Sequence, residues 1–223
     1  MIDSASRPPP IGVFGGTFDP VHIGHLRLAL EAYEILNLAE VRIIPLNEPN
    51  HRATPIVSAE CRLEMLRSAI DDQRLIADDR ELRRGGVSYT IDSLEELRAE
   101  FTEHPLCLLI GVDAFHNLCG WHRWQDLLRF SHLVVVARPD ADSALDPRLQ
   151  QLLSSVGVTD PGILRDELCG RIYFQPIPLL PISSTDIRER LAGGRDISYL
   201  VPPPVQQLIE QRQLYKSIDR YER

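Results

Sequence analysis

The sequence contains few cysteines, and none of them form a C-x-x-C pair. Four cysteines occur among the 223 residues, at the dispersed positions Cys61, Cys107, Cys119 and Cys169. No secretory segment precedes them, so we expect reduced thiols in a cytoplasmic protein rather than disulfides or a zinc centre. No hydrophobic run is long enough to span a membrane. The sequence therefore predicts a protein without a membrane partner.

Positive charge is also in deficit. The chain has 24 lysine and arginine residues against 32 aspartate and glutamate residues, which gives a formal net charge of -8 and a pI near 5.4. Such a chain repels the phosphate backbone of a nucleic acid unless a local basic patch overrides the repulsion. Nucleic acid is thus excluded as the main partner, whereas a small phosphorylated ligand needs only local charge.

Short apolar runs alternate with amphipathic segments along the chain. The apolar runs predict strands at residues 11–14, 41–45, 75–77, 106–110, 133–137 and 172–175. Helical spacing predicts helices at residues 23–36, 58–70, 91–101, 121–130, 147–155, 185–192 and 204–212. This order indicates an α/β protein with a Rossmann-like, open and mostly parallel sheet flanked by helices, and with a small C-terminal helical portion.

No repeat, low-complexity tract or domain boundary interrupts this order. With 43% hydrophobic residues, the chain is expected to form one domain over residues 1–223. Residues 1–10 are polar and proline-bearing, which predicts a flexible N-terminal arm, and residues 176–223 form a C-terminal segment. The weak patterning of residues 140–170 predicts a surface excursion.

Two charge runs are interpreted as solvated edges. Residues 78–81 read DDRE, and residues 83–84 are a pair of arginines. Because such runs commonly surround strands and turns at the surface, we assign them no chemistry.

A glycine turn with two histidines joins the first predicted strand to the first predicted helix. Residues 15–26 read GGTFDPVHIGHL. His22 and His25 stand three residues apart at the helix start, so they project from one face beside backbone N–H groups that attract anions. The glycines of the turn let a ligand approach the backbone closely. This layout predicts a phosphate-binding site.

The turn fits neither common nucleotide-binding fingerprint. It lacks G-x-x-x-x-G-K-[ST], and its glycines lack the G-x-G-x-x-G spacing. The main sequence evidence for a kinase or for a dehydrogenase is therefore missing. His22 and His25 could instead be capping or surface histidines, or two ligands of a zinc site. The sequence offers no cysteine pair or H-E-x-x-H helix to complete a metal site, which favours phosphate binding.

Further polar segments follow in the middle and near the end of the chain. They are SYT at residues 88–90, GVD at residues 111–113, Trp121, and ISSTDIR at residues 182–188. Ser183 with Asp186 also fits a plain capping box, and Trp121 with Trp124 fits a pair of core aromatics. Asp113 could cap a helix, but its position beyond a strand end favours a ribose contact.

In their order and spacing, these signatures resemble the nucleotidyltransferase superfamily with the H-x-G-H motif, most closely the bacterial nicotinate-mononucleotide adenylyltransferases. The resemblance extends over nearly the whole chain. It implies an enzyme of NAD biosynthesis, in which the 5′-phosphate of nicotinate mononucleotide attacks the α-phosphorus of ATP. The products are nicotinate adenine dinucleotide and pyrophosphate. No covalent enzyme intermediate is needed, because the acceptor phosphate is already an anionic nucleophile.

The resemblance implies a set of ATP-binding residues. They are Gly15, Gly16, Thr17, Phe18, His22, His25, Asp113, Ile182, Ser183, Thr185 and Arg188. His22 and His25 are the implied catalytic residues, with His25 the better candidate for stabilising the transition state. An adjacent phosphate is expected to favour the protonated, doubly donating form of histidine. Mg²⁺ is expected to arrive with ATP and to need no dedicated protein ligands.

The resemblance also implies a set of acceptor-binding residues. They are His51, Arg52, Tyr89, Thr90, Trp121 and His122. The pyridine ring is expected to stack on Trp121, and its carboxylate to accept hydrogen bonds from Thr90 and nearby amides. Because a carboxylate only accepts, a pocket of donors prefers nicotinate to nicotinamide. Asn50 and Arg52 stand where the family often has proline and lysine, although the charge at Arg52 is kept.

Several alternatives stay open at the level of sequence. A sister transferase acting on phosphopantetheine or on nicotinamide mononucleotide is the enzymatic alternative. A nucleotide-sensing regulator that binds ATP or a dinucleotide without catalysis is another, although the H-x-G-H element and Arg188 argue against it. A homo-oligomer is compatible with the sequence. Cys119, close to Trp121, either touches the pocket or packs in the core.

Overall fold

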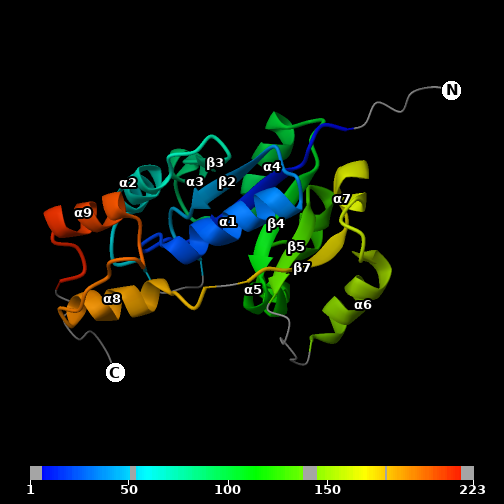
Figure 1. Cartoon of the computed structure of the whole chain (residues 1–223). Coiled ribbons are helices and arrows are strands. Elements are labelled where there is room, and N and C mark those ends of the chain that lie inside the picture. Colours follow the sequence, from blue (N-terminus) through cyan, green and yellow to red (C-terminus); the bar gives the residue numbers. More distant parts are fainter. Residues whose placement is uncertain (1–6, 51–53, 138–144, 179, 217–223) are drawn as a thin grey trace.

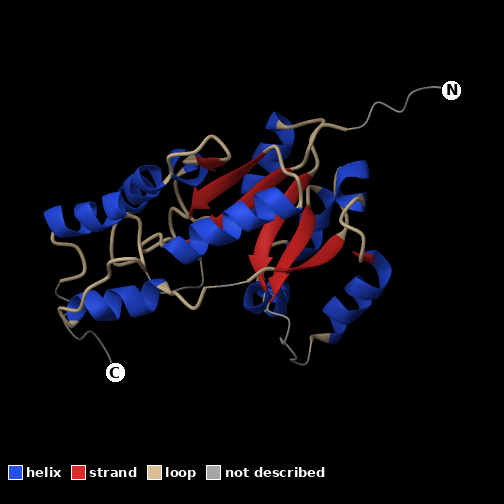
Figure 2. Cartoon of the chain, viewed as in Figure 1, coloured by secondary structure: helices blue, strands red, loops and turns tan. Residues whose placement is uncertain are grey.

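A computed structural model describes residues 7–50, 54–137, 145–178 and 180–216 (Figure 1). Over these residues the chain forms a seven-stranded sheet in the order β3-β2-β1-β4-β5-β7-β6, in which every neighbouring pair is parallel. Helices cover both faces of the sheet (Figure 2). The Rossmann-like α/β fold predicted from the sequence is confirmed.

The predicted elements recur with small shifts at their ends. The strands are β1 Ile11–Gly16, β2 Glu40–Pro45, β3 Leu75–Ala77, β4 Leu106–Gly111, β5 His132–Ala137, β6 Gly157–Val158 and β7 Ile172–Pro176. The α-helices are α1 Ile23–Ile35, α2 Ala59–Ala69, α3 Arg80–Arg84, α4 Thr90–Glu100, α5 Val112–His116, α6 Pro147–Val156, α7 Ile163–Asp166, α8 Ser184–Ala192 and α9 Pro203–Gln211. Two 3₁₀ helices, η1 Leu118–Gly120 and η2 Trp124–Arg129, complete the described part.

Each face of the sheet has its own hydrophobic core, because successive strand residues point to opposite faces. One core joins strand residues such as Val41 and Leu109 to α1, α2, α7, α8 and α9. The other joins strand residues such as Leu108 and Val135 to α4, α5, α6 and η2. Helix α9 also packs on α2, so the C-terminal helices are attached to the rest of the fold.

The structure differs from the prediction where the chain is irregular. The helix expected at residues 121–130 is replaced by the shorter η2, which begins only after Arg123 because that residue has a left-handed backbone at a φ of 51°. Helices α3, α5 and α7 and strand β6 were missed, since such short elements show no clear period. Residues 145–170 lie mostly at the surface, as expected, but they form α6, β6 and α7, and Leu149 and Leu164 are buried in the two cores. Residues 140–144 lie outside the described part.

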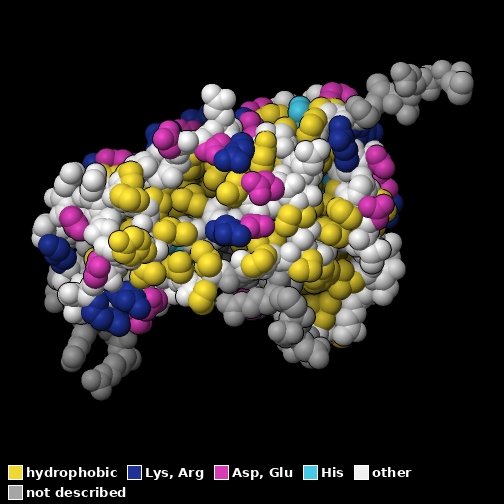
Figure 3. Space-filling view, viewed as in Figure 1, with side chains coloured by type: hydrophobic (Ala, Val, Ile, Leu, Met, Phe, Trp, Pro, Cys, Tyr) yellow, Lys and Arg dark blue, Asp and Glu magenta, His cyan; other side chains and the backbone are white. Residues whose placement is uncertain are grey.

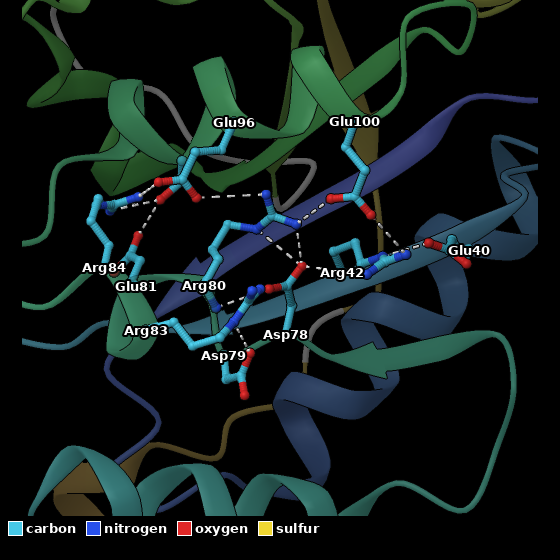
Figure 4. A network of polar contacts seen from close by, with 11 residues as sticks. Glu40, Arg42, Asp78, Asp79, Arg80, Glu81, Arg83, Arg84, Glu96 and Glu100 are labelled. Atoms are coloured by element: carbon cyan, nitrogen blue, oxygen red, sulfur yellow. Dashed lines mark hydrogen bonds and ion pairs between the residues drawn. The ribbon is translucent and has the colours of Figure 1, made fainter.

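The charge run after β3 is largely buried, contrary to the prediction of a solvated edge. Asp78 and Arg80 are each 4% exposed, and Nη2 of Arg80 lies 2.6 Å from Oδ2 of Asp78. Arg80 also reaches Glu100 of α4, and Arg42 of β2 lies 3.5 Å from Asp78 (Figure 4). These partners, distant in the sequence, compensate the charges and permit their burial. Arg83, with 69% of its side chain exposed, does lie at the surface.

The surface of the described part carries mixed charge. On the face shown in Figure 3, basic and acidic side chains are interspersed with hydrophobic ones. None of the helices in the described ranges is both long and apolar enough to cross a membrane. Of the expected N-terminal arm, residues 1–6 lie outside the description, and the carbonyl of Pro10 accepts the N–H of Ala39 at 2.8 Å.

Candidate active site

The predicted phosphate turn connects β1 to α1, where His22 is the N-cap of the helix. Nδ1 of His22 accepts the backbone N–H of His25, and Nδ1 of His25 accepts the backbone N–H of His22, each at 3.3 Å. The two rings stack with their centroids 3.6 Å apart. A Cβ at Gly24 would lie 3.0 Å from Nδ1 of His22, so glycine leaves room for the ring. The H-x-G-H spacing thus builds a reciprocal histidine cap.

The cap decides which nitrogen of each ring carries the proton. Because both Nδ1 atoms accept, each ring bears its proton on Nε2 and donates from that atom alone. Burial lowers the pKa of His22 to about 4. Burial, and secondarily the charge of His22, lower the pKa of His25 well below its ordinary value. In the ligand-free structure both rings are therefore neutral single donors, and the doubly donating form expected beside a bound phosphate stays a prediction.

We expect His22 and His25 to stay neutral, with the proton on Nε2, at pH 6 in the ligand-free protein. Multiple-bond ¹H–¹⁵N correlation spectra of the imidazole groups measure this directly, and doubly protonated rings at that pH would contradict the assignment. In the unfolded chain, each histidine takes up its second proton near the ordinary pKa of about 6.5. Folded His22 takes up that proton only near pH 4. The free energy of unfolding is therefore highest above about pH 6.5 and falls as the pH is lowered towards 4.

The C-terminal motif packs against the phosphate turn. The hydroxyl of Ser184 donates to the carbonyl of Pro20 at 2.9 Å. Nη1 of Arg188 donates to the carbonyl of Asp19 at 2.7 Å, and Nη2 donates to Oγ1 of Thr185 at 3.2 Å. The structure thus brings together two motifs that are far apart in the sequence, because the residues in these hydrogen bonds are separated by 164 and 169 positions.

Ser183 and Ile182 border the same turn. Ser183 is the N-cap of α8, and its Oγ accepts the N–H of Asp186 at 3.1 Å, which confirms the Ser183 half of the predicted capping box, while the Asp186 carboxylate accepts from Nε of Arg190 at 2.8 Å. Ile182 lies beside Gly24, since a Cβ built on that glycine would be 3.7 Å from the Cβ of Ile182. A cap at this position does not prevent ligand binding, because the helix start remains electropositive.

Phe18 and Asp113 differ in exposure. Phe18 is 2% exposed and packs edge-on against the ring of His25, with centroids 4.9 Å apart, so its side chain supports that histidine. Asp113 is exposed in the first turn of α5, just beyond the end of β4. Gly111, and not Asp113, is the N-cap of α5, so the alternative in which Asp113 caps a helix is wrong.

A cavity of about 200 Å³ lies beside the phosphate turn. It is lined by the predicted acceptor residues Tyr89, Thr90, Trp121 and His122, together with Gly15 and Gly16 of the turn. Ser88 of the SYT segment and Asn50, both singled out in the sequence, also line it, whereas the sequence did not point to the other lining residues, which are Leu46, Pro49, Glu81, Leu108, Leu109 and Ile110. The two predicted ligand sites therefore meet at the glycines.

The polar groups of the cavity come mainly from the start of α4. Tyr89 is the N-cap of α4 and makes no side-chain cap hydrogen bond, and its carbonyl accepts the N–H of Asp92 at 3.2 Å, so no Tyr89 side-chain cap competes with a ligand for the N–H groups of Thr90 and Ile91. The rings of Tyr89 and His122 lie 4.4 Å apart. Trp121 is partly buried against the second core. Cys119 packs in that core and is not among the residues that line the cavity.

Glu81 is a buried carboxylate in the cavity wall. It is 7% exposed, and its Oε1 accepts the hydroxyl of Ser93 at 2.8 Å. Burial raises the pKa of Glu81. The burial of Glu81 cannot be predicted from the charge run at residues 78–81, because Ser93, the hydrogen-bond partner of Glu81, lies on α4 and is distant in the sequence.

His51 and Arg52 lie outside the described residues, so their contacts with a phosphate stay predictions. On one side of them, Pro49 and Asn50 line the cavity. On the other side, the N–H of Ile56 donates to the Asp19 carboxylate at 2.7 Å. The described residues on either side of this pair thus lie at the cavity wall and beside the phosphate turn.

Comparison with known proteins agrees with this geometry. The Cytidylyltransferase-like family model matches residues 13–190. A probable nicotinate-nucleotide adenylyltransferase of Methylococcus capsulatus is 45% identical over 207 residues, which cover 92% of this chain and 99% of that protein. A relative of the same name from Pseudomonas putida (strain W619) is 47% identical over 209 residues, which cover 93% and 95%. The chain belongs to the nicotinate-nucleotide adenylyltransferase family.

A solved member of this enzyme class has the same fold. The Plasmodium falciparum nicotinic acid mononucleotide adenylyltransferase complexed with NaAD has a TM-score of 0.70 and 18% sequence identity, with coverage of 93% of this chain and 98% of that one. The resemblance to nicotinate-nucleotide adenylyltransferases inferred from the sequence motifs is confirmed.

Proposed function

We propose that the protein transfers the adenylyl group of ATP to nicotinate mononucleotide in NAD biosynthesis. The products are nicotinate adenine dinucleotide and pyrophosphate. The observation that carries this function is the shared wall formed by Gly15 and Gly16, which belong both to the histidine-capped turn and to the cavity containing Trp121. Ligands bound on the two sides of these glycines meet end to end. Membership of the nicotinate-nucleotide adenylyltransferase family supports the same reaction.

The reaction requires alignment and charge stabilisation. An oxygen of the acceptor phosphate forms a bond to the α-phosphorus of ATP while the bond to pyrophosphate breaks. His22 and His25 donate from Nε2 to the phosphate oxygens on which charge gathers, and the N-terminus of α1 adds its positive potential. His25 is the proposed transition-state stabiliser.

Both motifs supply the remaining ATP contacts in this proposal. The backbone from Gly15 to Phe18 and the Thr17 hydroxyl hold the phosphates from one side. Ser183, Thr185 and the guanidinium of Arg188 hold them from the other side. Ile182 borders the adenosine, and the exposed carboxylate of Asp113 accepts a hydrogen bond from its ribose.

Mg²⁺ enters this proposal as part of the MgATP substrate. Within the described ranges, no group of three or more His, Cys, Asp or Glu residues could hold a metal ion. Asp19, the carboxylate of the turn, already accepts hydrogen bonds from the N–H of Ile56 and the hydroxyl of Tyr215, each at 2.7 Å. Mg²⁺ commonly binds through substrate phosphates, so MgATP needs no such cluster.

Acceptor choice follows from the donors at the start of α4. The pyridine ring stacks on Trp121, and its carboxylate accepts from Thr90 and from the first amides of α4. Tyr89 and His122 form the adjoining wall, and His51 and Arg52 bind the acceptor phosphate. An amide presents N–H donors to the same groups, so nicotinamide is disfavoured.

Mixing the purified protein with MgATP and nicotinate mononucleotide is expected to release pyrophosphate and a dinucleotide. Absence of turnover would end this proposal. Comparing kcat/KM for nicotinate mononucleotide, nicotinamide mononucleotide and phosphopantetheine identifies the acceptor, and we expect the first to be highest. ATP binding by calorimetry without pyrophosphate release for any acceptor would instead indicate a nucleotide-sensing regulator.

We further propose a cytoplasmic location. All four cysteines are free thiols, which is usual in a reducing compartment. That the protein forms a homo-oligomer stays a prediction. Sedimentation velocity measures the oligomeric state in solution.

A further inference from the structure

Arg62 is a buried charge outside the set of residues proposed to touch either substrate. It lies on α2, is 1% exposed, and is the bulkiest of the fully buried side chains. Among the described residues it forms no ion pair, and its hydrogen bonds go to backbone carbonyls. Burying a guanidinium without a paired carboxylate is costly, so these hydrogen bonds have to compensate it.

The guanidinium of Arg62 joins the β1–α1 loop to both ends of the β2–α2 connection. Nη1 donates to the carbonyl of Thr17 at 2.8 Å, Nη2 to the carbonyl of Asn47 at 3.2 Å, and Nε to the carbonyl of Val57 at 3.4 Å. Thr17 follows β1, Asn47 follows β2, and Val57 precedes α2. Because a guanidinium is planar and rigid, it fixes the separation of the carbonyls that it binds.

Two of these carbonyls belong to opposite halves of the site. Thr17 is part of the turn proposed to hold the ATP phosphates. Asn47 leads to the acceptor half, because its N–H donates to Oγ of Ser88 at 2.8 Å and its Nδ2 donates to the carbonyl of Gly86 at 2.9 Å. The segment so held continues directly into Tyr89 and Thr90 of the cavity wall.

We propose that Arg62 is a positioning residue for adenylyl transfer, which fixes the distance between the two bound substrates. This inference rests on the proposed function. Because Arg62 bridges the donor turn and the acceptor segment, its loss changes the distance between the two half-sites more than it changes the geometry within either of them. A misplacement of about 1 Å between reacting groups can reduce the rate by about 10²-fold. The rate of the chemical step is therefore sensitive to Arg62, whereas the affinity for each substrate alone is not.

The chain offers a matched control in Arg98. Its guanidinium also donates to backbone carbonyls, those of Phe101, His104, Phe130 and Leu168 at 2.8 to 3.0 Å. These carbonyls lie before β4, β5 and β7, at the opposite end of the sheet from the cavity. Arg98→Lys therefore weakens a similar set of hydrogen bonds to backbone carbonyls without changing the distance between the bound substrates.

The test compares Arg62→Lys, Arg98→Lys and the wild type. Single-turnover experiments measure the chemical step, and calorimetry measures the Kd of ATP alone and of nicotinate mononucleotide alone. We expect Arg62→Lys to slow the chemical step by about 10- to 100-fold, with each Kd within about threefold of the wild type. Arg98→Lys is expected to lower the thermal midpoint without slowing chemistry. An unchanged rate in Arg62→Lys, or a parallel loss of both affinities, would overturn the proposal.

A second variant keeps the proposal testable if Arg62→Lys does not fold. Asn47→Ala removes only the Nδ2 bond to Gly86, at a partly exposed position. We expect it to slow the chemical step severalfold with the Kd of ATP unchanged, and a wild-type rate would count against the linkage. If the wild type itself shows no turnover, the proposed function fails; an active wild type with insensitive variants refutes only the role of Arg62.

Discussion

His25→Ala is expected to lower kcat by about 10²- to 10³-fold, the usual cost of removing one donor to a developing oxyanion. In the structure, the Nδ1 atom of His25 is occupied by the N–H of His22, so its Nε2–H is the group available to a phosphate oxygen. Alanine offers no donor at this position. The fold is expected to persist, because the loss of the His25 half of the cap costs only about 1 kcal/mol.

Steady-state kinetics with MgATP and nicotinate mononucleotide measure the effect of His25→Ala. His104→Ala is the matched control, since His104 bonds to the carbonyl of Pro9 at 2.8 Å, before β4 and away from the cavity. Circular dichroism and thermal unfolding establish that both variants fold. Near wild-type turnover in the His25 variant would remove this histidine from the mechanism.

Arg80→Met is expected to lower the free energy of unfolding by about 3–5 kcal/mol, the range for breaking a buried ion pair from one side. Arg80 donates to Oδ2 of Asp78 from Nε at 3.0 Å and from Nη2 at 2.6 Å, and both residues are buried. Methionine fills much of the same volume but leaves the carboxylate with a single cation, Arg42, at 3.5 Å. The contact of Arg80 with Glu100 of α4 is lost as well.

Arg83→Met provides the comparison for Arg80→Met. Arg83 lies on the same helix and pairs with Asp79 at 2.6 Å, but 69% of its side chain is exposed. Exposed pairs contribute only about 0–1 kcal/mol, so this variant should unfold close to the wild type. Urea denaturation at pH 7 measures both free energies. Equal effects at the two positions would mean that burial of the Asp78–Arg80 pair does not determine its contribution.

The sequence predicted the regular elements and the chemistry of the turn well, for a local reason. Strands such as β3 and β5 are apolar runs bounded by polar residues, and α1 carries a clear helical period. The H-x-G-H spacing is equally local, because a glycine between two histidines at a helix start permits the reciprocal cap by itself. Motif and periodicity therefore sufficed for the fold class and for the family.

Tertiary structure decided the features that depend on partners distant in the chain. The segment at 78–81 is buried because Arg42 and Glu100 compensate it, and neither lies near it in the sequence. Burial lowers the pKa of His22, so the ring is a neutral donor in the ligand-free protein, and its Nδ1 is held as an acceptor by the N–H of His25. Arg62 joins the two halves of the site only because the β1–α1 loop and both ends of the β2–α2 connection converge on it. Local patterning determines which elements form, whereas burial and charge compensation are properties of the packed whole.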